Sequence, residues 1–130
     1  MIRRFILAVV AVFIAWAVLD FIIHGLILQS TYQATAQLWR PMGQMKMGLM
    51  YLVTFVGAAS FAGLYAILKS AVAGLKYGLL FGIAIGFPMG FGTYSYMPVP
   101  LTLAVTWFIG SLVETIVGGA IVGAIIKAEV

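Results

Sequence analysis

The stretch GLKYGLLFGIAIGFPMG, residues 74–90, decides the fold of this chain. A glycine stands at every fourth position of it, at Gly74, Gly78, Gly82, Gly86 and Gly90. In water this segment would be a poor helix, because each interior glycine costs roughly 1 kcal/mol relative to alanine. In a bilayer the segment must satisfy its own backbone hydrogen bonds, so a helix is nearly forced, and small residues then let a second helix approach closely. The stretch therefore predicts a membrane helix suited to close packing.

The composition of the whole chain also indicates a membrane protein. Of the 130 residues, 65% are hydrophobic and 8% are charged, whereas a soluble domain carries about 25% charged residues. There is no cysteine, so the sequence gives no basis for a disulfide framework or for thiol chemistry. The net charge of +4 comes from basic residues scattered between apolar runs, which indicates membrane topology and not nucleic-acid binding. We expect one domain embedded in a lipid bilayer, with no nucleic-acid partner.

Long apolar runs predict four membrane-spanning helices. The first run continues past Ala15-Trp16-Ala17, which resembles a signal-peptide cleavage site, so we interpret it as a span and not as a signal peptide. In the polar stretch that follows, Tyr32, Ala36 and Trp39 lie at helical spacing and predict a short interfacial helix between the first two spans. Pro88 predicts a kink in the third span. The predicted spans are about 5–28, 47–68, 75–95 and 101–126.

The basic residues predict how this all-α bundle is oriented. With four spans, both ends of the chain and the 69–76 turn share one side of the membrane, and that side holds five basic residues against two on the other. Because cytoplasmic loops carry an excess of Lys and Arg, we predict an integral four-helix bundle of the inner (cytoplasmic) membrane with cytoplasmic N- and C-termini. The five basic residues are Arg3, Arg4, Lys69, Lys76 and Lys127, and the two are Arg40 and Lys46.

A second series of small residues with four-residue spacing lies in the fourth predicted span, and we expect it to pack against the glycines of the third. Four-residue spacing drifts by about 40° per step on a helix with 3.6 residues per turn. Either the third span wraps around the fourth, or the two ends of its glycine series face different partners. Such long series suggest a homo-oligomer or a subunit of a larger membrane complex. The second series is Ser111, Thr115, Gly119 and Gly123.

Three ionisable side chains inside the predicted spans are candidates for a proton or cation site. Asp20 and His24 share a helix face because they are four residues apart, and Glu114 lies near the middle of the fourth span. Burying such a group costs about 2.5–3.5 kcal/mol on insertion scales, so it is a functional-site hypothesis by default. If the first and fourth spans are neighbours, a His between two carboxylates could relay protons or bind a cation. The alternative is structural: Glu114 is neutral and hydrogen-bonded to a hydroxyl, and Asp20 and His24 form a local pair near the interface.

Four methionines at the predicted outer side form the pattern M-x-x-M-x-M-x-x-M. Thioethers are soft ligands that suit Cu(I), and such clusters resemble the methionine motifs of copper-handling proteins. Against copper binding, Arg40 and Lys46 flank or interrupt the cluster, and methionine is also an ordinary filler of irregular packing. Both interpretations remain open for these residues, which are Met42, Met45, Met47 and Met50.

Three segments resemble small four-span bacterial membrane proteins of uncharacterised function: LDFIIHG (19–25), YQATAQLWRP (32–41) and PMGFGTYSYMPVPLTLAVTWFIGSLVE (88–114). The resemblance implies fold and membrane location and brings no activity with it. The four-span size is also similar to that of small multidrug-resistance transporters, which carry one membrane-embedded Glu in their first helix. This chain departs from that pattern, because its first span has Asp20 and its Glu114 lies in the last.

Two function classes follow from these observations. The first is a structural or accessory membrane subunit without catalysis, whose intramembrane acids are satisfied locally. The second is a small proton- or cation-coupled transporter or channel that uses Asp20, His24 and Glu114. Copper handling by the methionines is a third. We expect no enzyme, because the sequence has no nucleophile-elbow motif and no phosphate-binding loop, and its single His excludes a haem with two axial histidines from one chain.

Overall fold

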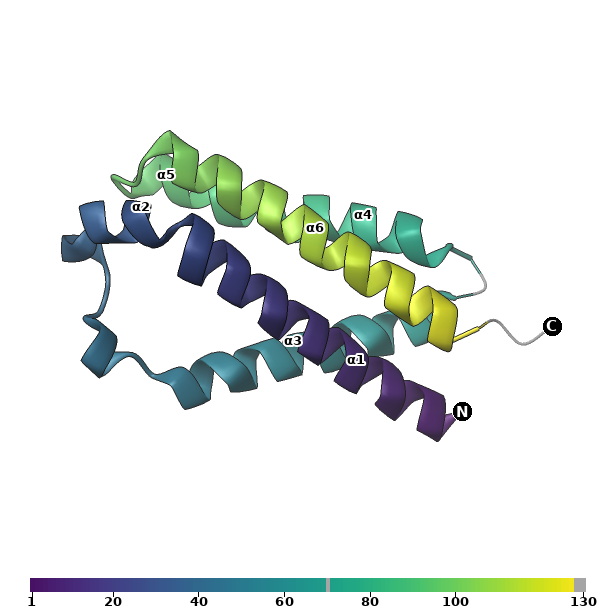
Figure 1. Cartoon of the computed structure of the whole chain (residues 1–130). Coiled ribbons are helices and arrows are strands. Elements are labelled where there is room, and N and C mark those ends of the chain that lie inside the picture. Colours follow the sequence, from purple (N-terminus) through teal and green to yellow (C-terminus); the bar gives the residue numbers. More distant parts are fainter. Residues whose placement is uncertain (70, 128–130) are drawn as a thin grey trace.

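A computed structural model of the chain describes residues 1–69 and 71–127, and these residues are helical over most of their length (Figure 1). Two long helices are interrupted by π-helical segments, where the hydrogen bonds run from residue i to i+5. The long helical stretches are α1 (Ile2–Asp20) continued by the π segment Phe21–Ile27, α3 (Met47–Leu68), α4 (Gly74–Phe87) continued by the π segment Pro88–Gly92 and by α5 (Thr93–Tyr96), and α6 (Leu101–Ile125).

Within the described residues, four helical stretches are long and apolar enough to cross a membrane, which makes the chain a multi-pass membrane protein. They are Ile2–Ile27, Met47–Leu68, Gly74–Tyr96 and Leu101–Ile125, each within a few residues of the bounds predicted from sequence.

The segment between the first two spans is less regular than its sequence pattern predicted. Helix α2 covers only Gln29–Ala34, and the short 3₁₀ turns Ala36–Leu38 and Met42–Gln44 follow it. The helix ends because Thr35 has non-helical backbone angles, φ −117° and ψ 28°. The Thr35 hydroxyl donates to the Thr31 carbonyl at 2.8 Å and accepts from Trp39 Nε1 at 2.8 Å. The prediction of one helix carrying both Tyr32 and Trp39 was therefore wrong. Side-chain hydrogen bonds of Thr35, and not a further helical turn, fix the position of Trp39.

Helices α4 and α6 lie side by side along their length, and the glycines of the third span line this contact (Figure 1). A Cβ added to Gly74 would lie 2.8 Å from the Gly123 Cα, and one added to Gly86 would lie 2.7 Å from the Ser111 Cβ. At Gly78 the added atom would meet the backbone of Thr115. No side chain fits between the two backbones at these positions, so glycine is what permits this spacing.

All five glycines from Gly74 to Gly90 face α6, although their spacing predicted drift away from a straight neighbour. The first meets the Gly119–Gly123 turn of α6, and Gly90 meets the carbonyl of Ala104 at the opposite end. The π segment that begins at Pro88 helps to keep the series on one neighbour, because it holds more residues per turn and so rotates Gly90 back toward α6. The kink that was predicted at Pro88 stays a prediction.

Helix α1 packs between α3 and α6, and Trp16 is the side chain that joins the three. The Trp16 indole lies edge-on to Phe61 of α3, with ring centroids 5.2 Å apart. Its Nε1 donates to the backbone carbonyl of Glu114 in α6 at 2.6 Å. Gly118 leaves room for the ring, because a Cβ there would lie 3.1 Å from Trp16 Nε1. Tyr77 of α4 closes the other side of Phe61, with its hydroxyl donating to the Phe61 carbonyl at 2.8 Å.

The first half of α3, residues 47–56, differs from the rest of the bundle. Its side chains are exposed almost all the way round within the described structure, whereas Ala58, Phe61, Ala62 and Tyr65 of the second half are buried. Figure 1 shows this first half running apart from the other helices. The helix is thus anchored at one end only, at the end where α1 begins and α6 ends.

Candidate functional site

The polar side chains inside the bundle meet where α1 ends against the middle of α6. Asp20 is the last residue of α1, and Glu114 lies in the central turns of α6. The two carboxyl groups lie within interaction range of each other. Glu114 Oε1 is buried and has no hydrogen-bond partner among the described residues. A buried carboxyl oxygen without a partner is costly, and such an atom in a native structure calls for an explanation.

Asp20 contacts His24 as well as Glu114. Its Nε2 is 3.9 Å from Asp20 Oδ1, one turn along the same helix. Both side chains are partly exposed, at 45% for His24 and 38% for Asp20. The structure therefore brings the three predicted residues into one series with Asp20 in the middle, whereas the sequence-based hypothesis had His24 between the carboxylates.

His24 continues the series to the segment that connects the first two spans. Its Nδ1 is 2.6 Å from the Tyr32 hydroxyl oxygen, and the two rings are stacked with centroids 5.9 Å apart. Trp107 of α6 donates its Nε1–H to the same oxygen at 2.8 Å. Because the Tyr32 oxygen already accepts from Trp107, its own hydrogen is free to point at His24 Nδ1, which favours a neutral imidazole with its proton on Nε2, toward Asp20.

Tyr32 lies outside the spans, and its surroundings keep it protonated. Burial raises the pKa of Tyr32 above its ordinary value of 10; the Asp20 charge raises this pKa further, and the hydrogen bond from Trp107 opposes both. The phenol thus remains a hydrogen donor throughout the physiological range. Trp39 packs edge-on against Tyr32, with centroids 5.4 Å apart, and against Trp107 at 6.0 Å. This aromatic cluster fixes the position of the Tyr32 hydroxyl.

Sequence reasoning did not identify the roles of four residues that build this site. Tyr32 and Trp39 were predicted only as interfacial aromatics, and the roles of Trp16 and Trp107 were not predicted at all. A signal was present, since the indole N–H groups need partners when they are buried. The spacing of the tryptophans in the sequence does not predict which acceptor each indole N–H binds.

Asp20, His24 and Glu114, the predicted cation ligands, do not form a metal-binding cluster in the described part of the chain. Among residues 1–69 and 71–127, no group of three His, Cys, Asp or Glu side chains is arranged to hold a metal ion. The methionine series lies on the 3₁₀ turn Met42–Gln44 and the first turn of α3, where Met42, Met47 and Met50 are exposed. Copper binding by these thioethers stays a prediction.

The comparison with known proteins adds no family to this description. No family model, no curated protein and no solved structure matches the chain. The function is therefore argued from the geometry of the site.

Proposed function

We propose that this multi-pass membrane protein is a small proton-coupled transporter or channel, in which the Asp20–Glu114 pair is the proton-binding site. The observation that carries the proposal is the buried Glu114 Oε1, which has no hydrogen-bond partner in the described part of the chain, on a side chain that interacts with the Asp20 carboxyl group. Two charged carboxylates in a low-dielectric interior repel each other strongly. A proton shared by the pair removes one charge and supplies the missing hydrogen bond.

The same geometry favours a proton over a metal ion as the bound species. The three ionisable groups form a series and not a cluster around one point, and a series of this kind passes a proton from group to group. His24 and Tyr32 extend it from the carboxyl pair to the end of the bundle that carries the connecting segment. The contact of 3.9 Å between His24 and Asp20 is too long for a hydrogen bond, so transfer there needs a small side-chain movement or a bridging water.

The orientation and cellular location belong to the same proposal. The start of α1 and the end of α6 lie at one end of the molecule, with the α3–α4 turn (Figure 1). Five basic residues belong to that end in the sequence, against two in the connecting segment, which supports cytoplasmic termini in an inner membrane. The His24–Tyr32 end of the series would then face outward.

The test is proton flux in liposomes that contain the purified protein and a trapped pH-sensitive dye. An imposed pH gradient with a potassium–valinomycin potential should drive flux through the wild type. Glu114→Gln and Asp20→Asn should each reduce the proton flux to the level of empty liposomes. Each variant replaces one carboxyl group by an amide, so the pair can no longer share, bind and release the proton. Thr106→Val is the matched control: Thr106 lies on the same helix and its hydroxyl bonds only the Thr102 carbonyl at 2.7 Å.

Two outcomes would contradict this proposal. Wild-type liposomes as tight to protons as empty ones, over a range of imposed potentials, would remove the transport function. Flux that persists in correctly assembled Glu114→Gln protein would show that protons pass by another route.

The second candidate function, a structural subunit without catalysis, is favoured by one separate observation. The apolar side chains of α3 over residues 47–56 are exposed on nearly all sides, more than a helix in a self-contained bundle requires. A second copy of the chain or another membrane protein packed on this segment would give the homo-oligomer or larger complex expected from sequence. Crosslinking through a cysteine placed at Leu52 tests it: a dimer band that depends on that position supports assembly, and a monomer at every protein-to-lipid ratio contradicts it.

A further inference from the structure

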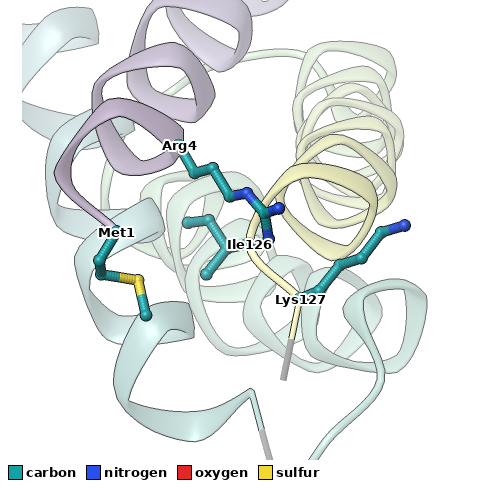
Figure 2. A pocket seen from close by; sticks show the side chains of 4 residues that line it. All are labelled: Met1, Arg4, Ile126 and Lys127. Atoms are coloured by element: carbon teal, nitrogen blue, oxygen red, sulfur yellow. The ribbon is translucent and has the colours of Figure 1, made fainter. Parts of the chain in front are cut away.

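A polar pocket lies at the end of the bundle where α1 begins and α6 ends, far along the helices from the carboxyl pair. Met1, Arg4, Ile126 and Lys127 line it, and its volume is about 280 Å³ (Figure 2). Figure 2 shows the Arg4 side chain reaching toward Ile126, and the Lys127 side chain extending outward just after the end of α6. Ile126 is 1% exposed and contributes an apolar surface to the lining.

The charges at this end of the molecule attract an anion. Arg4 and Lys127 carry full positive charges, and Lys69 lies nearby, with its Nζ 3.9 Å from the Met1 sulfur. The carboxyl end of α6 opposes them with about half a negative charge from the helix dipole. Among the described residues this sum is positive, so the pocket favours a group with concentrated negative charge. The planar guanidinium of Arg4 matches phosphate oxygens in a two-pronged geometry that a lone ammonium cannot give.

The surroundings favour a phosphate that carries acyl chains. The pocket opens at the ends of two helices whose outer sides bear exposed apolar residues, among them Ile2 and Ile6 of α1. At this depth in a bilayer the phosphates of lipid headgroups are the most abundant anions, and basic pockets at the cytoplasmic ends of spans bind them. The volume of the pocket falls just below the range of about 300–1,000 Å³ for drug-sized ligands, as suits a single headgroup.

We propose that this pocket binds a phosphate group, held by Arg4 and Lys127, that is supplied by an anionic phospholipid or by free inorganic phosphate. The proposal rests on the cavity and its charges and not on proton coupling. It assigns a role to the α1–α6 ends that neither function class includes: a bound headgroup would bridge the first and last helices and fix their ends relative to each other.

The experiment measures lipid retention by native mass spectrometry of the detergent-purified full chain. Phosphatidylglycerol and phosphatidylcholine of the same acyl composition are titrated against wild type, Arg4→Gln and Lys127→Gln. Lys46→Gln is the matched control, since it removes one positive charge from the connecting segment at the other end. Each comparison is repeated in a Glu129→Gln background, which removes the carboxylate that follows Lys127 by two positions in the sequence.

The wild type should retain phosphatidylglycerol over phosphatidylcholine, and Arg4→Gln and Lys127→Gln should each weaken that retention by about fivefold, the factor expected for one basic side chain near anionic lipid. Lys46→Gln should leave it unchanged. An arm with inorganic phosphate separates the two sources: displacement of the lipid by millimolar phosphate identifies a free-phosphate site, and retention in its presence identifies a lipid site. Equal retention of the two lipids, or equal losses in Arg4→Gln and Lys46→Gln, would overturn the proposal.

Discussion

The close contact of α4 with α6 makes a quantitative prediction at Gly78. In Gly78→Ala the new Cβ would meet the backbone of Thr115 and lie 3.0 Å from the Ile116 Cα. Backbone atoms inside a helix cannot move away singly, so the two helices must separate along their length. Overpacking of this kind typically costs about 1–3 kcal/mol. In a bilayer, where packing and not the hydrophobic effect holds helices together, no compensating burial is gained.

Gly92→Ala is the control for this substitution, because Gly92 belongs to the same span and a Cβ there would meet nothing within 4 Å. Alanine is the better helix former by roughly 1 kcal/mol, so this variant should be as stable as the wild type or slightly more stable. The gain in helix propensity is common to both changes, so the two variants should differ by the overpacking cost alone, about 1–3 kcal/mol.

The measurement is the free energy of unfolding, from titration of the micelle-bound protein with dodecyl sulfate, followed by circular dichroism and by tryptophan fluorescence. The helices themselves persist in detergent, so helix content changes little when they separate. Fluorescence from Trp16 and Trp107 therefore reports the separation of the helices more directly. If Gly78→Ala unfolds at the same detergent fraction as Gly92→Ala, the close approach of α4 and α6 does not stabilise the fold, and the reasoning from glycine spacing fails.

Three further substitutions test side-chain hydrogen bonds of the bundle. Trp16→Phe removes the donor to the Glu114 carbonyl and should lower the free energy of unfolding by about 1–2 kcal/mol in the dodecyl sulfate titration; no loss would mean that the ring acts by packing alone. Tyr77→Phe removes the bond to the Phe61 carbonyl and should cost about 1 kcal/mol in the same assay, and a larger loss would point to repacking around the ring. Tyr32→Phe should slow proton flux more than it lowers stability; flux equal to the wild type would exclude the phenol from the proton series.

Much of the fold could be predicted from the sequence because the bilayer leaves few choices. An apolar run of sufficient length must be a helix in lipid, so the bounds from Leu101 to Ile125 follow from hydropathy alone. Glycines at four-residue spacing mark a face that admits a second backbone, and the partner had to offer small residues too. Thr115 and Gly119 met that condition. Helix length and small-residue spacing are constraints of solvation and shape, and both can be read from a short stretch of sequence.

The site could be predicted only in part, for a different physical reason. Asp20 and His24 were placed correctly on one face, since their spacing decides that by itself. The joining of His24 to Tyr32 depends on the π segment after Asp20 and on the end of α2 at Thr35. Both are small changes of backbone geometry that are decided by tertiary contacts. No periodic sequence pattern encodes these changes. A pattern that assumes regular α-helices therefore assigns the residues after each change to the wrong helix face.

Two neighbouring residues of α6, Thr115 and Glu114, face different helices. One belongs to a tightly packed contact with α4, and the other belongs to a contact with α1 that can respond to a proton. Thr115 lies against Gly82 of α4, and its hydroxyl bonds its own helix at the Ser111 carbonyl, so that contact is closed and buried. Glu114, one position away, faces α1 and has one carboxyl oxygen without a hydrogen-bond partner among residues 1–69 and 71–127.

A change of charge at Glu114 therefore acts on the contact between α1 and α6 and leaves the contact between α4 and α6 intact. Helix α1 is also the one that changes from α to π hydrogen bonding directly after Asp20, where its backbone is easiest to adjust. Amide hydrogen exchange should accordingly be slow in α4 and faster over Phe21–Ile27, and Glu114→Gln should alter exchange in the second segment alone.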